Sequence, residues 1–245
     1  MKRREQLEQL LMNSKKGQLM STLLEEDNWA FLCSLSSYIE DMLNYDQMSP
    51  YHCFDLLEHT CVTVENVLSS DVSEDEYRLL KVAAFFHDIG KPVVMKEKVN
   101  QYNEKRHVYY GHPEASIRIA KPILMDLGYD SYELNRILVY IGAHDSFIQL
   151  RMKDECYVNG QKTGVIDVKT VKRIEDRFIH RHQDLNPTYH DFTVMINLCY
   201  GDAVAHVDKI YNHDGEVIDT CNDRVRRIKA LKKVCKTIEE ESKTH

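Results

Sequence analysis

Apolar residues recur at helical spacing through most of this chain. Seven segments place them at positions i, i+3 and i+4, which is the pattern of an amphipathic helix. Only nine Gly and five Pro interrupt the 245 residues, few for an all-β or a dinucleotide-binding α/β protein. The sequence therefore predicts an all-α fold. The predicted helices are 52–68, 75–88, 113–127, 131–144, 169–184, 190–211 and 222–241.

One interval has the character of strands rather than of a helix. Residues 154–168, DECYVNGQKTGVIDV, contain Asn159 and Gly160, a pair that favours a hairpin turn. We therefore expect a small β-hairpin-like element in this part of the chain.

The length of the chain allows one main domain with an appendage. Residues 1–45 have the pattern of one or two amphipathic helices and are predicted to form an N-terminal helical appendage. Residues 46–245 are predicted to form the main domain. No apolar run approaches the roughly 20 residues that span a bilayer, so no membrane partner is expected.

Cysteine usage and charge indicate the surroundings of the protein. Seven Cys without C-x-x-C spacing, behind a charged and helical N-terminus, favour reduced thiols and a cytoplasmic location. The net charge of −7 argues against a general nucleic-acid binder. A basic stretch from Arg224 to Lys236 is more typical of a solvated helix face than of an RNA contact. RNA therefore stays open as a partner, and so does the oligomeric state.

The stretch VAAFFHDIGKP, from Val82 to Pro92, carries the strongest chemical signal. An apolar run ends in His87 and Asp88, and Gly90 and Pro92 then stop the helix. A carboxylate at the end of a buried run costs several kcal/mol unless its charge is compensated. The sequence therefore raises the question of which group compensates the negative charge of Asp88.

Several other segments direct His or Asp toward the interior. Taken singly, each histidine is more often a core or capping residue than a metal ligand. An interior Asp can equally be paired with Lys or Arg instead of binding a metal. Together, imidazole and carboxylate suit divalent metals such as Zn, Fe, Mn or Ni. His52, His107 and His190 are expected to be ordinary surface or turn residues. The residues of the predicted metal site are His59, His87, Asp88, His112, His144 and Asp202.

This ordered set resembles the H…HD…H…H…D pattern of the HD superfamily of metal-dependent phosphohydrolases. Four segments look similar to the HD domain attached to bacterial tRNA nucleotidyltransferases and poly(A) polymerases. The resemblance covers roughly 46–210 and implies an all-α HD-domain helical bundle. Relative to that domain, residues at about 150–190 are an insertion, which is expected to form one wall or lid of the pocket and to influence the choice of substrate. No Gly-Ser turn with paired carboxylates of the nucleotidyltransferase type is found, so it implies hydrolysis rather than nucleotide addition. The four segments are Asp46–Thr60, Phe85–Pro92, Tyr109–Ser116 and Tyr200–His206.

The resemblance also implies a role for each motif residue. It makes His59, His87, Asp88 and Asp202 the ligands of one metal. It makes His112 and His144 the ligands of a second metal, with Asp88 as a bridge. Asp88 is then a catalytic residue as well as a ligand.

Three further residues are implicated in catalysis or substrate binding. The resemblance places Lys91 against the substrate phosphate, where it is both catalytic and substrate-binding. A helix C-terminal cation is the other interpretation of Lys91. Relatives that act as 5′-nucleotidases often carry Glu there, so this Lys disfavours that subgroup. Asp145 is expected to orient a ligand or water, and His206 to contact the substrate.

The expected activity is hydrolysis of a phosphomonoester or phosphodiester of a nucleotide or nucleic-acid end by metal-activated hydroxide. One or two divalent ions are expected, and the sequence does not distinguish Mn, Mg, Ni, Fe and Zn. Two alternatives remain open. One is a non-catalytic regulatory or RNA-associated HD module, and the other is a di-iron oxygenase on the same fold.

Overall fold

The structure is a computed structural model that describes most of the chain. Helices make up most of the described residues, which confirms the predicted all-α class. None of these helices combines the length and the hydropathy that a membrane-spanning segment needs. The described residues are 2–13, 15–49, 52–99, 103, 105–147, 152–158, 161–206, 208–211, 217–221 and 223–243.

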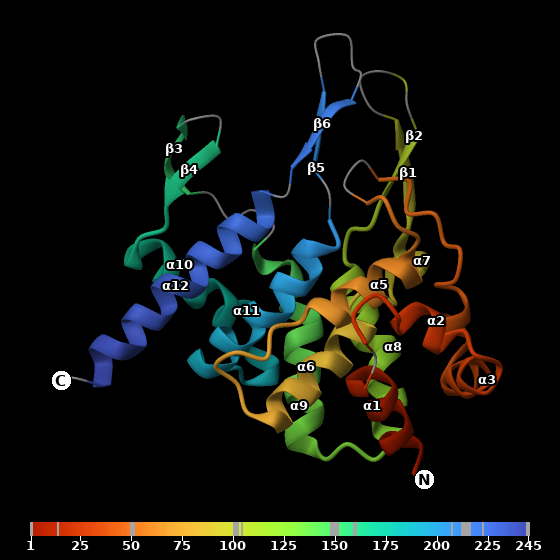
Figure 1. The fold of residues 1–245 in the computed structure, drawn as a ribbon. Coiled ribbons are helices and arrows are strands. Elements are labelled where there is room, and N and C mark those ends of the chain that lie inside the picture. Colours follow the sequence, from red (N-terminus) through yellow and green to blue (C-terminus); the bar gives the residue numbers. More distant parts are fainter. Residues whose placement is uncertain are drawn as a thin grey trace.

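Five central helices carry much of the buried apolar core. They are α5 (Leu56–Asn66), α6 (Glu74–Phe86), α8 (His112–Asp126), α9 (Ser131–Ala143) and α11 (Tyr189–Val204). α11 packs closely against α5, while α9 packs against both α6 and α8 (Figure 1). The apolar spacing predicted each of these helices. The largest difference is in α11, which ends seven residues before the predicted position 211.

Local capping explains where three of these helices begin. Ser73 accepts a hydrogen bond from the backbone N–H of Glu76, and the Glu76 side chain accepts one from the Ser73 backbone. The same reciprocal arrangement joins Asp130 to Glu133 at the start of α9, and Thr188 to an Asp at the start of α11. Such a capping box satisfies two backbone donors that the first turn of a helix leaves unpaired. These starts are therefore determined by neighbouring residues.

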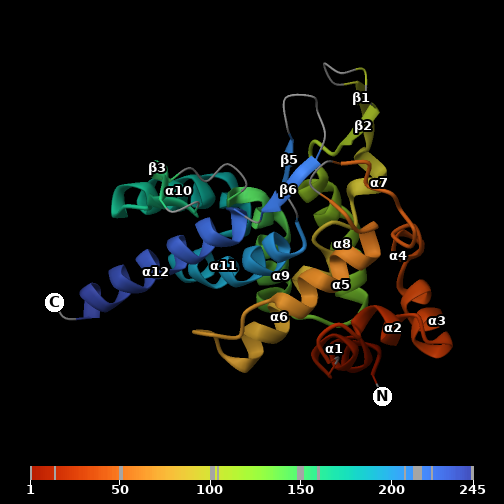
Figure 2. The same ribbon diagram turned by 45° about the horizontal axis from the view of Figure 1, so that its top comes forward.

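Shorter and outer helices surround the bundle. Four short helices occupy the region before residue 46, where one or two were expected, and α1 packs against α6. At the opposite side of the molecule α10 and the long α12 lie near each other in both views (Figures 1 and 2). These elements are α1 (Arg3–Asn13), α2 (Leu19–Leu23), α3 (Glu26–Leu35), α4 (Ser37–Glu40), α7 (Lys91–Val94), η1 (His144–Phe147), α10 (Val168–Arg181), η2 (Gln183–Leu185) and α12 (Asp223–Lys243).

Three separate antiparallel hairpins occur within the described residues, where one was predicted. The predicted one is β3–β4, although its expected turn at Asn159 and Gly160 lies outside the described residues. The other two were missed, and the predicted helix 190–211 gives way to a strand at its end. The strands of β1–β2 are short and exposed or half-buried, so they lack the apolar alternation that reveals a strand. The hairpins are β1 (Lys96–Val99) with β2 (Lys105–Val108), β3 (Lys153–Val158) with β4 (Gln161–Val165), and β5 (Asp208–Tyr211) with β6 (Val217–Cys221).

Candidate metal centre

The HD pair lies in a tight turn between α6 and α7. α6 ends at Phe86, and His87 and Asp88 follow it, both buried. Gly90 donates its backbone N–H to Ser116 Oγ at 2.9 Å, and a Cβ at Gly90 would come within 2.5 Å of the Ser116 backbone nitrogen. Glycine is therefore required for the turn to approach α8 this closely. The approach brings Asp88 beside the start of α8.

The structure brings together all six residues of the predicted site, from α5, the HD turn, α8, η1 and α11. On one side of Asp88, His59 Nε2 lies 3.3 Å from Asp88 Oδ2 and 3.1 Å from Asp202 Oδ1. His87 Nε2 lies 3.1 Å from the same Asp88 oxygen and 3.6 Å from Asp202 Oδ1. These four buried side chains form the first group.

On the other side of Asp88, two histidines face its second oxygen. His112 Nε2 lies 3.1 Å from Asp88 Oδ1 and 3.0 Å from His144 Nε2. His144 Nε2 lies 3.5 Å from Asp88 Oδ1. Asp145, which is partly exposed, places its oxygens 3.3 and 3.6 Å from the Nε2 atoms of His112 and His144. The second group therefore shares Asp88 with the first, with Asp145 at its edge.

The histidine rings are oriented by backbone carbonyls. Nδ1 of His87 donates to Ala84 O at 2.7 Å, and Nδ1 of His144 donates to Ile141 O at 2.6 Å. His112 Nδ1 donates to a carbonyl in the same way, at 2.9 Å. Because a carbonyl only accepts, these Nδ1 atoms carry protons and their Nε2 atoms point into the site. This arrangement is typical of histidines that bind a metal through Nε2.

The donor set fits divalent cations. Asp88 Oδ1 is buried and accepts no hydrogen bond from the described residues, although the Nε2 atoms of His112 and His144 surround it. Carboxylate oxygens and imidazole lone pairs this close together repel one another unless a metal cation or a proton lies between them. In each of three buried sets of residues, the possible ligand atoms lie within 4.8 Å of one another. The sets are His59 with His87 and Asp88, His59 with Asp202 and His206, and Asp88 with His112 and His144.

Both interior carboxyl groups are ionised in this environment. Burial by itself raises the pKa of Asp88, but the charges of His87 and Lys91 outweigh burial and hold that pKa well below its ordinary value. Burial also opposes the charged form of Asp202, and its interactions with His206 and His59 hold its pKa well below the ordinary value. Both groups are therefore available as anionic ligands near neutral pH.

Lys91 points into the same site. It is buried, and its Nζ lies 2.6 Å from Asp88 Oδ2 and donates to Gln47 Oε1 at 2.8 Å. The interpretation of Lys91 as a helix C-terminal cation is wrong, because Lys91 begins α7 and its ammonium contacts side-chain oxygens. Gln47 was not among the predicted site residues. It is fully buried, and its backbone oxygen accepts a hydrogen bond from Tyr109 at 2.6 Å. A lone glutamine in a loop gives no signal that would have identified it.

Two histidines lie closer to the site than predicted. His52 was expected at the surface, but its ring centroid lies 4.4 Å from that of His206 and 4.9 Å from that of His59. His107 lines the pocket beside the site. The seven-residue spacing of His52 and His59 was the only available signal. The expectation for His190 is confirmed, since it is an exposed residue that pairs with Glu76.

A pocket of about 390 Å³ opens onto the two groups. Its inner wall carries Asp88, Lys91, Asp145, Asp202 and His206. Asp202 and His206 are both buried, and His206 Nδ1 donates to Asp202 O at 2.7 Å. Its outer wall comes from β2 with the following turn, and from the start of α12. None of the described residues of the 150–190 segment lines this pocket, and the wall or lid expected from that segment stays a prediction.

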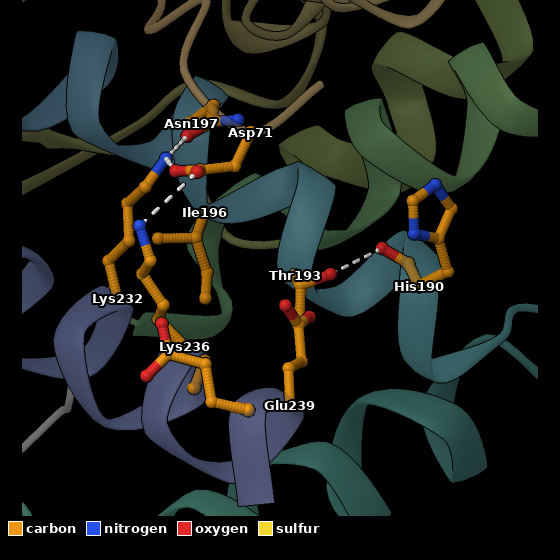
Figure 3. A pocket seen from close by; sticks show the side chains of 10 residues that line it. Asp71, His190, Thr193, Ile196, Asn197, Lys232, Lys236 and Glu239 are labelled. Atoms are coloured by element: carbon orange, nitrogen blue, oxygen red, sulfur yellow. Dashed lines mark hydrogen bonds and ion pairs between the residues drawn. The ribbon is translucent and has the colours of Figure 1, made fainter. Parts of the chain in front are cut away.

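A second pocket of about 520 Å³ lies between α11 and α12 (Figure 3). Its charged groups pair with one another: Lys232 contacts Asn197 and lies 3.4 Å from Asp71, which also lies 3.7 Å from Lys236. It shares no lining residue with the pocket at the two groups, and none of the candidate metal groups of the described residues lies in it. The chemistry of the described residues is therefore concentrated around Asp88.

Comparison with known proteins agrees with this geometry. The family model of the HD domain matches residues 52–170, which include five of the six site residues. Asp202 comes from α11, beyond the matched segment. A search of curated proteins gives no match. The closer relationship to the HD domain of tRNA nucleotidyltransferases stays a prediction. Residues 52–170 of this chain are therefore similar to the HD domain, the domain of a superfamily of metal-dependent phosphohydrolases.

Proposed function

We propose that this protein is a phosphohydrolase that uses one or two divalent metals to cleave a phosphomonoester or phosphodiester of a nucleotide or nucleic-acid end. The observation that carries the proposal is the position of Asp88. Its two oxygens face two separate His-containing groups, and both groups open onto one pocket that also contains a buried lysine.

The proposed ligands follow from the two groups. His59, His87, Asp88 and Asp202 would hold the first metal, and Asp88 with His112 and His144 would hold the second. Bound divalent metals lower the pKa of water and offset the negative charge of the phosphoryl oxygens. Mn, Mg, Ni, Fe and Zn are all compatible with this mixed set of donors.

Three further residues of the site, Lys91, Asp145 and His206, would bind and orient the substrate. Lys91, fixed by Gln47, is positioned to donate a charge-assisted hydrogen bond to a phosphoryl oxygen. Asp145, at the partly exposed edge of the second group, can accept a proton or a hydrogen bond from water in the pocket. His206 lines the pocket on the Asp202 side, where it would contact the substrate.

The test is hydrolysis of bis-p-nitrophenyl phosphate and p-nitrophenyl phosphate without oxygen, after chelation and reloading with each candidate metal. We expect turnover only with metal. Asp88→Asn should lower it by more than about 100-fold, because both groups lose their shared ligand. Asp184→Asn, an exposed carboxylate in η2, is the matched control and should keep full activity.

Elemental analysis of the same variants separates one metal from two. Asp88→Asn should lose both metals, Asp202→Asn mainly the first, and His112→Ala or His144→Ala mainly the second. Full metal content and activity in both histidine variants would contradict the second site. Oxygen-dependent activity would favour the di-iron oxygenase, and bound metal without any turnover would favour the non-catalytic module.

A further inference from the structure

A single continuous segment builds one side of the pocket at the metal centre. Every residue from Arg106 to Pro113 lines the pocket, so this wall runs from β2 through a turn to the first residues of α8. The β1–β2 hairpin projects from the helical bundle in both views (Figures 1 and 2). His112, near the end of this wall, belongs to the second group. The segment therefore joins a projecting hairpin directly to the metal centre.

Two neighbouring tyrosines of this wall have different surroundings. Tyr109 is half-buried, its hydroxyl donates to Gln47 O at 2.6 Å, and its ring lies 6.4 Å from that of Tyr45. Tyr110 is 68% exposed, and among the described residues that line the pocket it is the only exposed large apolar or aromatic side chain. Tyr109 therefore anchors the wall, whereas Tyr110 presents its ring at the mouth of the pocket.

The ring of Tyr110 is oriented from its hydroxyl end. Lys98 of β1 donates to the Tyr110 hydroxyl at 3.3 Å, and its Nζ lies 4.8 Å from the ring centre. Because the ammonium lies closer to the hydroxyl than to the ring centre, and the side chain stays largely exposed, most of the ring is open to a ligand. A tyrosine has few rotatable bonds, so a ring held in this way loses little conformational entropy when a ligand stacks on it.

The position of Tyr110 in the chain puts its ring close to the metal centre. Tyr110 and His112 are two residues apart, so their Cα atoms are separated by at most about 7 Å. Gly111 between them has a φ of +77°, which glycine adopts without strain, and it turns the chain from the hairpin into α8. A phosphoryl group at the metal centre therefore leaves the organic part of the substrate beside Tyr110. The pocket volume of about 390 Å³ suits a small-molecule group.

We propose that Tyr110 is the platform on which the nucleobase of the substrate stacks, directly beside the phosphoester that is cleaved. This inference rests on the proposed function and assigns the residue that distinguishes nucleotides from phosphate esters without a base. Every nucleobase has a π-face, and stacking on an aromatic side chain strengthens binding by about 5- to 150-fold per base. A phosphate ester of a sugar alone has no π-face to place against the ring.

The first measurement is binding and does not depend on turnover. The ligands are 5′-deoxyadenosine 5′-phosphonate and 5-deoxyribose 5-phosphonate, which differ in the presence of the base and carry a carbon–phosphorus bond that a phosphohydrolase does not cleave. Both are titrated calorimetrically into the metal-loaded protein. We expect the adenosine compound to bind at least about tenfold more tightly, and Tyr110→Ala to reduce this ratio to about twofold or less.

Further substitutions separate stacking from other effects. Tyr110→Phe and Tyr110→Trp keep a π-face and should keep the wild-type ratio within about threefold. Tyr110→Leu keeps apolar volume without a π-face and should behave as Tyr110→Ala, which it replaces if thermal melting shows that the alanine variant is unfolded.

Tyr132 provides the matched control. It is 64% exposed on α9, the Arg136 guanidinium lies 5.0 Å from its ring centre, and it does not line this pocket. Tyr132→Ala should therefore keep the wild-type ratio.

The second measurement is kinetic. In Tyr110→Ala, kcat/KM for adenosine 5′-monophosphate relative to ribose 5-phosphate should fall by about tenfold or more, through a higher KM for the nucleotide. A 5′-phosphorylated oligonucleotide is assayed beside the mononucleotide. The better substrate of the two identifies a free nucleotide or a nucleic-acid end as the source of the base, and its turnover should depend on Tyr110 in the same way.

The outcomes separate the two proposals. Hydrolysis of ribose 5-phosphate together with an unchanged binding ratio in Tyr110→Ala would overturn the platform and leave the phosphohydrolase intact. A ratio that depends on an aromatic ring at this position, without turnover of any phosphoester, would support the platform and overturn the proposed activity. An equal loss in Tyr132→Ala, or a loss in Tyr110→Trp as large as in Tyr110→Ala, would also overturn the platform.

Discussion

The ammonium of Lys91 is held between two buried oxygen atoms of different chemistry. One belongs to the carboxylate of Asp88, and the other to the neutral amide of Gln47. Tyr109 in turn fixes the backbone of Gln47. A cation with few rotameric choices loses little entropy when it binds a phosphate. Gln47 is therefore a positioning residue, and Lys91 is the residue that we place against the substrate.

Replacement of Lys91 and Gln47 tests this division of roles. Lys91→Ala should lower kcat by about 100-fold with metal content unchanged, because a charge-assisted hydrogen bond to the phosphoryl group is lost. Gln47→Met should lower kcat by about tenfold, because Lys91 remains but is less well oriented. Gln9→Met, at an exposed glutamine of α1, is the control. Equal kcat values for the wild type and Lys91→Ala would show that Lys91 has no role in catalysis.

The contact between α11 and α5 decides whether the first group of ligands forms. A Cβ at Gly201 would come within 2.5 Å of Thr63 O and 3.0 Å of Val67 N, both backbone atoms of the α5 region. The next residue, Asp202, reaches His59 across this contact at 3.1 Å. The missing side chain therefore sets the distance between two helices and, with it, the position of a ligand.

Alanine substitution at two helical glycines tests this contact. Gly201→Ala should destabilise the protein by about 1–3 kcal/mol and lower metal content, because backbone atoms do not move aside. Gly142→Ala is the matched control. Its nearest neighbour, at 2.9 Å, is the terminal methyl group of Ile117, which can rotate away, and alanine favours a helix over glycine by up to about 1 kcal/mol. Urea unfolding and elemental analysis measure both effects, and similar losses in the two variants would contradict the explanation.

At the scale of the whole molecule, the first helix is attached to the bundle by a charge network. Arg4 donates to Glu133 at 2.7 Å and to Glu8 at 3.0 Å. Arg78 donates to Glu8 at 2.6 Å and to Glu133 at 3.2 Å. The Arg4 guanidinium also lies 4.2 Å from the centre of the Tyr129 ring. The division of the chain at residue 46 stays a prediction, but α1 is joined to α6 and α9 through shared partners.

Two neighbouring arginines of α1 allow this attachment to be measured. Arg4→Met should lower the free energy of unfolding by about 1–3 kcal/mol, because Glu8 and Glu133 then share a single partly buried cation. Arg3 pairs with Asp126 at the surface, where both side chains are about half exposed or more. Arg3→Met should therefore cost less than about 1 kcal/mol. Equal effects in urea unfolding would contradict a special role for the network.

The sequence by itself determined the helices and the chemical content of the site. Apolar spacing identified the five central helices, and capping pairs such as Ser73 with Glu76 determine where three of them begin. The order of His and Asp residues indicated the metal centre, because imidazole and carboxylate at the ends of buried helices require a compensating charge. These signals act over a few residues, so they are readable without the fold.

Only the tertiary structure decided which side chains meet. His52 and His190 were assigned the same surface role, yet His52 lies beside His59 and His206 whereas His190 is exposed. Gln47 contacts Lys91 from a loop, and Arg106 lines the pocket from a hairpin, and neither segment has a periodicity that would reveal this. Their positions depend on the packing of elements far apart in the chain, which local propensity and spacing do not encode.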